Sequence, residues 1–567
     1  MCQEENESRG ICYAFCFLPL ALYVYGWFDK GVEYDKVEIY DGKNKIGEAE
    51  EGIERHNVLL HYGNKFNFEK GWRCYVDRYK EADSAASIYA VAVKNGKREA
   101  CISVQVKGVS VQNVFSCLAK HADAENNVLV IPGASNKIPM LNEIARRMKN
   151  YNFIVLLEAV PEDRVVSRQE LMQMVYDQYG IQTQESNLHV YIMPLLFVRN
   201  KFMAKKTVTL EETDQGILRK NEWLNELSDV IREKFPNMEK SYSQYYVCKF
   251  YDFIDLAMSY LKIRGIMLWN QFFVLHDIIK HIGETRKLPI IYSESGVLPG
   301  TLAFETLGQM GESMPAVQYE EFKGLGVSAE ELAQAQQILE YMYESKLNRW
   351  GKYNVYKKDQ LKTACSEIMP GRPIIFYAGQ NDYESGIKPY TATTKECHSP
   401  IFKSSYEAAV ALGEICKKNE WNLIYKRHPM MRREKAREIL PSNIINFDEL
   451  EIHDIIDFSD VTITILSQTA YVALIRNKPV VMLGYNQLRG KGCVYEAFDI
   501  EKIEDQISCA LKFGRTQAQK QEFILHAAQL LKYYLFNDMN EKTHGCYGRN
   551  QDELVSYIDQ KLKGDMR

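Results

Sequence analysis

The stretch Leu423-Ile424-Tyr425-Lys426-Arg427-His428-Pro429 places an apolar run directly before a polar elbow, and a helix is predicted to follow it. The same arrangement returns at Val461-Thr462-Ile463-Thr464-Ile465-Leu466-Ser467-Gln468-Thr469, and a further apolar run follows at 479–483. Apolar runs that alternate with helices are typical of a parallel sheet in an α/β domain. Because the carboxyl ends of parallel strands meet along one edge, both elbows are expected on the same edge of one sheet.

Both elbows carry groups that suit a bound phosphate. The first elbow, Lys426-Arg427-His428-Pro429, offers two cations and an imidazole, and its proline fixes the start of the next helix. The second elbow, Ser467-Gln468-Thr469, offers hydroxyls and backbone N–H groups at a helix start, with Ser467 expected as the N-cap. A surface histidine and an ordinary N-cap are the alternatives for each elbow alone. Their shared sheet edge favours an anion site.

Two further loops of this C-terminal part are candidates for contacts with the same ligand. Gly379 and Gln380 directly follow a strand predicted at 372–378, so that their amides could contact a diphosphate or a base. They do not form a GxGxxG fingerprint. The loop Gly490-Lys491-Gly492 is either a flexible loop over the ligand or an ordinary surface loop.

A carboxylate that could carry catalysis stands in another α/β segment. Ser293-Glu294-Ser295-Gly296 follows a strand predicted at 288–292, and Glu294 is expected to project into an inter-domain cleft. A carboxylate there could take a proton from an acceptor hydroxyl or attack an anomeric carbon. The alternative is a helix-capping or salt-bridged glutamate. Glu305 is a second carboxylate in the same Gly-rich stretch.

Composition excludes some classes of protein. The 567 residues carry 70 basic and 75 acidic side chains, a net charge of −5, so no global field attracts nucleic acid. The 13 cysteines show no CxxC pair, which indicates reduced thiols and a cytoplasmic location. No HExxH or DxD motif is found, so no metal site is expected.

One segment, Ile11 to Phe28, is apolar enough to raise the question of a membrane anchor. It is shorter than the ~20 residues that a spanning helix needs, and Pro19 interrupts it. Acidic residues precede it, where a signal peptide would carry Lys or Arg. A buried pair of strands is therefore the preferred interpretation.

The period of the apolar pattern divides the chain into three predicted domains. Residues 1–108 alternate apolar and polar positions around the turns Asp41-Gly42 and Asn95-Gly96, which predicts a small β-sandwich. Residues 109–350 and 351–567 read as two Rossmann-like α/β domains. The predicted fold class is therefore α/β, with two Rossmann-like domains behind a small N-terminal β-sandwich.

From about Asn127 to Leu562 the chain resembles bacterial capsular polysaccharide biosynthesis glycosyltransferases, which include Kdo-transferase-like proteins and, more distantly, GT-B sialyltransferases. Tyr292-Ser293-Glu294-Ser295-Gly296 is similar to the family's catalytic acidic element, although Ser295 stands where a second acid is common. Lys426-Arg427-His428-Pro429 is similar to its HP motif. Ser467-Gln468-Thr469 stands where the family has a pair of hydroxyl residues. The N-terminal segment around Tyr25-Gly26-Trp27 resembles immunoglobulin-like modules attached to some of these enzymes.

The resemblance implies a GT-B arrangement and a metal-independent glycosyltransferase that adds a sugar to a surface or capsular polysaccharide. The implied donor is a nucleotide sugar, CMP-linked to an acidic sugar of the Kdo or sialic-acid type, and no cofactor is needed. A glycan or lipid-linked glycan would be the acceptor, with the enzyme cytoplasmic and a peripheral association with the inner face of the membrane allowed. The implied catalytic residues are Glu294 and His428. The implied donor-binding residues are Lys426, Arg427, Pro429, Ser467, Gln468, Thr469, Gly379 and Gln380.

Two other classes of protein remain open at this point. A teichoic-acid-type CDP-alditol phosphotransferase also combines a GT-B fold with HP and Ser-rich elements. A non-catalytic capsule assembly or glycan-binding protein would explain the missing second acid beside Glu294.

Overall fold

The computed structural model describes residues 9–17, 21–53, 70–76, 87–105, 107–108, 121–157, 187–193, 208–235, 238–346, 367–431, 438–448, 450–538 and 547–564. The chain forms two compact units, Met1–Arg264 and Gly265–Arg567. The predicted domain boundaries near 108 and 350 adjoin or fall in segments outside the described residues, so the three-domain division stays a prediction.

The first unit begins with two small sheets. One has the order β5-β6-β2-β1-β9, antiparallel except for the β1–β9 pair, and the other is the antiparallel sheet β4-β3-β7-β8. Their strands are β1 (Gly10–Phe17), β2 (Ala21–Phe28), β3 (Lys36–Asp41), β4 (Asn44–Glu48), β5 (Glu50–Ile53), β6 (Gly71–Val76), β7 (Ser87–Lys94), β8 (Lys97–Gln105) and β9 (Lys107–Gly108). Buried side chains of both sheets share one core, as in a sandwich. The resemblance of this part to an immunoglobulin module stays a prediction.

The apolar segment 11–28 forms the antiparallel pair β1–β2, in which Gly10 faces Phe28 and Phe17 faces Ala21. The predicted buried strand pair is therefore confirmed. No helix within the described ranges has the length and apolar character needed to cross a membrane.

The cysteines of the described residues differ in state. Cys101 on β8 is disulfide-bonded, so the expectation of reduced thiols is wrong at this position. The free cysteines among the described residues are Cys12, Cys74, Cys248, Cys397, Cys416, Cys493 and Cys509.

The rest of the first unit is α/β. Its strands β10 (Asn127–Ile131), β11 (Asn152–Leu157) and β12 (Leu188–Ile192) are parallel, in the order β12-β11-β10. All five residues of β10 are buried, as expected for a strand of a parallel sheet covered on both faces. Its helices are α3 (Ile138–Arg147), α6 (Glu212–Lys220), α7 (Trp223–Lys234) and α8 (Lys240–Tyr260).

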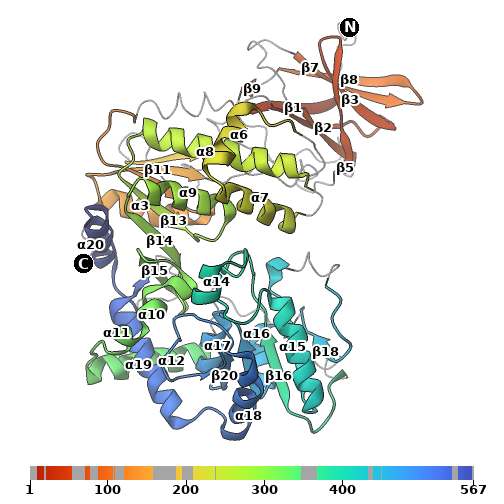
Figure 1. Cartoon of the computed structure of the whole chain (residues 1–567). Coiled ribbons are helices and arrows are strands. Elements are labelled where there is room, and N and C mark those ends of the chain that lie inside the picture. The colour runs from red at the N-terminus through yellow and green to blue at the C-terminus, as the bar shows by residue number, and fades with distance from the viewer. Residues whose placement is uncertain are drawn as a thin grey trace. The chain divides into compact units, whose positions relative to one another are not determined.

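The second unit opens with β13 (Gly265–Trp269) and β14 (Ile290–Ser295), a parallel pair. β15 (Thr301–Glu305) runs antiparallel to β14, and β22 (Leu535–Asn537) runs antiparallel to β15. The C-terminal helix α20 (Gln551–Leu562) packs against β14 and β22 (Figure 1). The other helices here are α9 (Val274–Thr285), α10 (Met314–Val317), α11 (Tyr319–Lys323) and α12 (Ala329–Ser345). α12 begins at a capping box formed by Ser328 and Glu331.

A second parallel sheet occupies the C-terminal half of this unit, in the order β18-β17-β16-β19-β20-β21. Its strands are β16 (Ile374–Ala378), β17 (Asn422–Lys426), β18 (Ile444–Asn446), β19 (Val461–Thr464), β20 (Val480–Met482) and β21 (Tyr495–Glu496). Its helices are α14 (Ala392–Cys397), α15 (Ser405–Lys418), α16 (Ile452–Phe458), α17 (Thr469–Ile475), α18 (Ile503–Phe513) and α19 (Gln517–Tyr533).

Side chains of this sheet alternate between two cores, because successive residues of a strand point to opposite faces. Ile375 and Tyr377 of β16 pack in one core with α15 and α18, whereas Phe376 and Ala378 pack in the other with α12, α17 and α19. Helices thus cover both faces of the sheet (Figure 1). The predicted fold class, α/β with two Rossmann-like sheets behind small N-terminal sheets, is confirmed.

Candidate functional site

Three strands of the C-terminal sheet end at one edge. Ala378 lies beside Lys426 in the register of β16 and β17, and Tyr377 lies beside Ile463 in the register of β16 and β19. The Gly379 N–H donates to the carbonyl of Lys426 at 3.0 Å, and the Thr464 hydroxyl donates to the carbonyl of Ala378 at 2.9 Å. The prediction that both elbows lie on the same edge of one sheet is therefore confirmed.

Gly379 lets the ends of β16 and β17 approach closely. A Cβ atom on this residue would lie 2.9 Å from the Tyr425 ring and 3.1 Å from the Lys426 carbonyl oxygen. Contacts that short are not tolerated without a shift of the neighbouring strand. The glycine is thus required by packing at this edge, in addition to its predicted role in donor binding.

Gln380 ties the end of β16 to the second elbow. Its side chain is 4% exposed, and its Oε1 accepts a hydrogen bond from the Leu466 N–H at 3.1 Å. Its own backbone N–H donates to the Ser405 hydroxyl at 3.2 Å. The Gln380 Nε2 is buried and has no hydrogen-bond partner among the described residues. A buried amide that lacks an acceptor is a candidate donor to a bound ligand.

The two cations of the first elbow contact the protein itself. The Lys426 ammonium donates to the carbonyl of Asp448 at 2.7 Å. The guanidinium of Arg427 is 2% exposed and forms ion pairs with Asp448 at 3.1 Å and with Glu438 at 3.2 Å. Burial disfavours the charge of Asp448, but hydrogen bonds from Arg427 and Asn446 outweigh it and lower the pKa of that carboxyl. These contacts brace the elbow, and the proposed donor-binding role of both cations stays a prediction.

His428 is half-buried at the end of the first elbow. Its Nδ1 lies 3.2 Å from the Met430 N–H, which donates to it, so that the ring proton is assigned to Nε2. Pro429 is exposed and begins a 3-10 turn that includes Met430 and Met431. An imidazole with this tautomer can donate a hydrogen bond from Nε2 to a phosphate oxygen.

The second elbow differs from the prediction in one detail. The N-cap of α17 is Gln468 rather than Ser467, because Ser467 lies one residue further from the helix. The Ser467 hydroxyl nevertheless accepts the Thr469 N–H at 3.2 Å and contacts the Thr469 hydroxyl at 3.1 Å. The Gln468 Nε2 is buried without a partner among the described residues, like that of Gln380.

Glu294 lies on β14 beside a second buried carboxyl group. Tyr292 faces Glu305 across β14 and β15, so Glu294, two residues along, points to the same face of the sheet as Glu305. Both side chains are buried, at 6% and 5% exposure. Glu305 accepts hydrogen bonds from the Tyr534 hydroxyl at 2.5 Å and the Met314 N–H at 2.7 Å. Burial, reinforced by the charge of Glu294, raises the pKa of Glu305 well above its ordinary value.

The carboxylate of Glu294 also acts on α17, the helix that follows the second elbow. Burial raises the pKa of Tyr471 well above its ordinary value, and the charges of Cys493 and Glu294 raise it further. The Tyr471 hydroxyl lies 3.0 Å from Nε2 of the buried His526. Glu294 is therefore within electrostatic range of a residue in the first turn of α17.

Sequence reasoning missed a buried network around Glu312. Its Oε1 lies 2.9 Å from Nε2 of His398 and its Oε2 accepts a hydrogen bond from Gln271 at 2.7 Å. His398 is 1% exposed and its carbonyl accepts the Tyr485 N–H. The Gly-rich stretch 308–313 was the only signal of this network in the sequence.

The burial of the Lys491 side chain contradicts one of the two interpretations of its loop. Its side chain is buried, and its ammonium donates to the carbonyls of Pro315, Tyr319 and Arg489. Burial lowers the pKa of Lys491 to about 8. An ordinary surface loop is therefore wrong for this side chain, whereas a flexible loop over the ligand stays a prediction.

The described ranges contain no cluster of three or more His, Cys, Asp or Glu side chains that could hold a metal ion. Metal independence stays an expectation.

No family model matches the chain, and no curated protein matches it. Among solved structures, it is similar to the beta Kdo 2,7 transferase KpsC of Thermosulfurimonas dismutans, with 16% identity, 59% of this chain and 94% of that chain covered, and a TM-score of 0.33. The beta Kdo 2,4 transferase KpsC of the same organism matches with 15% identity, 52% and 87% coverage and a TM-score of 0.36. The wall teichoic acid polymerase TagF matches with 10% identity, 80% and 92% coverage and a TM-score of 0.24. Similarity at this level says nothing about activity.

Proposed function

We propose that this chain is a metal-independent GT-B glycosyltransferase that moves a sugar from a nucleotide donor to a glycan or lipid-linked glycan. The observation that carries the proposal is the meeting of both elbows at one edge of a parallel sheet, where α/β proteins bind ligands. Hydroxyl, imidazole and amide donors gather at this edge, and they match the needs of a phosphate.

The donor in this proposal is an acidic sugar linked to CMP, because the HP-like and hydroxyl-bearing elbows resemble those of enzymes that use such donors. A CMP leaving group carries one phosphate. His428, Lys426 and the hydroxyls of Ser467 and Thr469 would stabilise its charge, and the unpaired amides of Gln380 and Gln468 would add donors. Pre-placed donors of this kind do not require a metal ion. A cytoplasmic enzyme at the inner face of the membrane would meet both substrates there.

Glu294 is the proposed catalytic carboxylate. As a base it would take the proton of the acceptor hydroxyl while that oxygen attacks the anomeric carbon and the bond to the CMP phosphate breaks. Two adjacent buried carboxyl groups do not both ionise easily. Burial and the neighbouring charge of Glu294 raise the pKa of Glu305 well above its ordinary value, so Glu305 resists ionisation and Glu294 is assigned as the base.

Nucleotide binding tests the proposal directly. Isothermal titration with CMP, CDP, UDP and GDP should show selective binding of CMP. Replacing His428 with Ala removes a donor to the phosphate, and because a hydrogen bond to a charged group contributes ~1.5–3 kcal/mol, CMP affinity should fall about tenfold or more. Turnover should be abolished while the fold remains intact.

Met430→Ala is the matched control, since this side chain is 63% exposed in the same turn and its hydrogen bond to His428 comes from the backbone N–H, which the substitution keeps. It should bind CMP like the wild type. Wild-type turnover in His428→Ala would disprove the assignment of the first elbow. Preference for CDP would instead favour the alditol phosphotransferase, and no nucleotide binding would favour a glycan-binding protein.

A further inference from the structure

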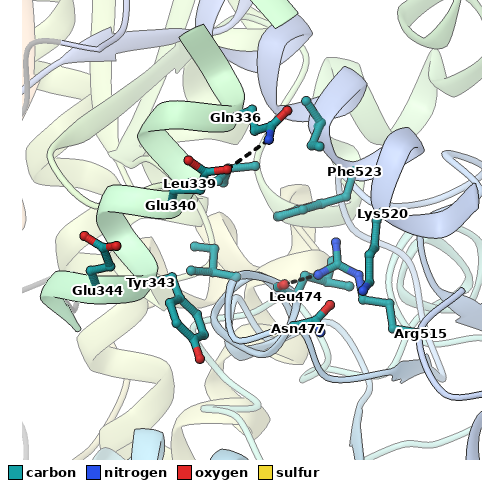
Figure 2. A pocket seen from close by; sticks show the side chains of 12 residues that line it. Gln336, Leu339, Glu340, Tyr343, Glu344, Leu474, Asn477, Arg515, Lys520 and Phe523 are labelled. Carbon is teal, nitrogen blue, oxygen red and sulfur yellow. Dashed lines mark hydrogen bonds between the residues drawn. The ribbon is translucent and has the colours of Figure 1, made fainter. Parts of the chain in front are cut away.

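A second candidate ligand site lies at the other end of α17 from the elbow. A cavity of about 330 Å³, open to solvent, lies between α12, the C-terminal end of α17, and α19 with the residues before it (Figure 2). Leu339, Leu474 and Phe523 form its apolar wall and are buried. A volume of this size is at the lower end of the range for small-molecule sites.

Arg515 is the unusual group in this cavity. Its guanidinium donates to the carbonyl of Leu474 and lies over the Phe523 ring, 5.0 Å from the ring centre. Its Nε is buried and has no acceptor among the described residues, and no carboxylate among them pairs with it. Burial lowers the pKa of Arg515 to about 10.

Arg515 is half-buried, and its Nε is shielded from water without an acceptor among the described residues. A guanidinium that loses part of its water and gains no opposite charge is destabilising. One of its N–H groups is satisfied by the end of α17, but the Nε–H is not. A ligand oxyanion in the cavity would supply the missing opposite charge. Lys520 lines the same wall and adds a second positive charge.

The opposite wall has different chemistry. Glu340 and Glu344 of α12 line the cavity on the side away from Arg515 and Lys520, and Glu340 accepts a hydrogen bond from Gln336 at 2.9 Å (Figure 2). These acidic side chains disfavour a ligand that is anionic at both ends. The apolar wall between the two charged walls suits a hydrocarbon or aromatic body.

We propose that this cavity binds a small carboxylate whose charged end pairs with Arg515 and whose apolar body packs on Phe523 and Leu474. The site is separate from the elbows at the strand edge, and it does not depend on the function proposed for them. The occupant has one negative end and an apolar body.

The test uses the full chain and a series of benzoate, phenylacetate and 3-phenylpropionate, each compared with its uncharged amide. Ligand-observed NMR and isothermal titration measure binding. At least one acid is expected to bind tenfold or more tightly than its amide. Equal binding of acids and amides, or no saturation by any acid below ~10 mM, would overturn the proposal.

Variants locate the binding site. Arg515→Met keeps an apolar stem on Phe523 but removes the guanidinium, and should weaken binding of the best acid at least tenfold. Ile524→Trp leaves Arg515 in place and fills the cavity, and should abolish binding. Phe513→Ala, a change at an exposed residue outside the cavity, should bind like the wild type.

Circular dichroism first establishes that each variant is folded. Wild-type affinity in folded Arg515→Met contradicts the proposal. If Arg515→Met does not fold, Ile524→Trp decides, because binding that survives a filled cavity must occur elsewhere.

Discussion

Replacing Glu305 with Gln is expected to change how the stability of the protein depends on pH. Glu305 is enclosed by the protein, and burial raises its pKa well above the ordinary value of 4.5. The folded state therefore binds a proton that the unfolded chain has already released at pH values above 4.5. The contribution of Glu305 to the free energy of unfolding is therefore fully present only below pH 4.5. It decreases as the pH rises from 4.5 through the raised pKa, so that unfolding becomes easier.

The size of the effect follows from linkage. One proton held by the folded state alone costs about 1.4 kcal/mol of stability for each unit of pH. From about pH 5 until the folded pKa is reached, the wild type should lose that amount per pH unit relative to Glu305→Gln. The amide does not titrate, and it can keep both hydrogen bonds by accepting from the Met314 N–H and donating to the Tyr534 oxygen.

Urea unfolding between about pH 4.5 and 7.5 measures this difference, followed by circular dichroism and by fluorescence so that coincident transitions can be required. Tyr534→Phe provides the contrast, because it changes the same contact and leaves the titrating carboxyl group in place. It removes the hydroxyl that donates to Glu305 and should cost ~1–3 kcal/mol. A constant difference in free energy between wild type and Glu305→Gln across this range would refute the reasoning.

Other changes test the packing of the site and its surroundings. Gly379→Ala should cost ~1–3 kcal/mol and weaken CMP binding, whereas Gly326→Ala, with open space around its Cβ, should cost little in urea unfolding. Asp448→Ala removes the buried ion-pair partner of the Arg427 guanidinium and should lower the free energy of unfolding by ~3–5 kcal/mol. Asp559→Asn breaks an ion pair with Lys563 at the surface and should lower it by ~0.5 kcal/mol or less. Burial lowers the pKa of His453 to about 4, so stability should fall as pH drops from 6.5 toward 4, and His453→Leu should flatten that acid limb in thermal melts. A His453→Leu protein with an unchanged acid limb would exclude this residue as the cause.

The sequence was sufficient to predict features that depend on local pattern. The strand pair at 11–28 followed from the length of the segment and its interrupting proline. The convergence of the two elbows followed from a general rule, since parallel strands that are linked through helices place equivalent ends at one edge.

Features that depend on distant partners were not predictable. The sequence pattern around Arg427 predicts a cation at the end of a strand. The ion pairs of Arg427 with Glu438 and Asp448 depend on how later loops return to the sheet. The glycines on both sides of Lys491 suggested an exposed loop. Its ammonium is instead bound by the carbonyls of Pro315 and Tyr319, which lie far earlier in the chain. Periodicity assigns a face to a side chain but cannot name the group across from it.

Helix α17 connects the second elbow with the cavity that contains Arg515. Its seven residues, at ~1.5 Å each, span only ~10 Å between the hydroxyl-bearing elbow at Thr469 and the carbonyl of Leu474 that Arg515 holds. A helix of two turns has little capacity to absorb a displacement at one end without passing it to the other. Thermodynamic linkage makes such an effect reciprocal. If the carboxylate proposed to bind at Arg515 changes the affinity of the anion proposed to bind at Thr469, the anion changes the affinity of the carboxylate by the same factor.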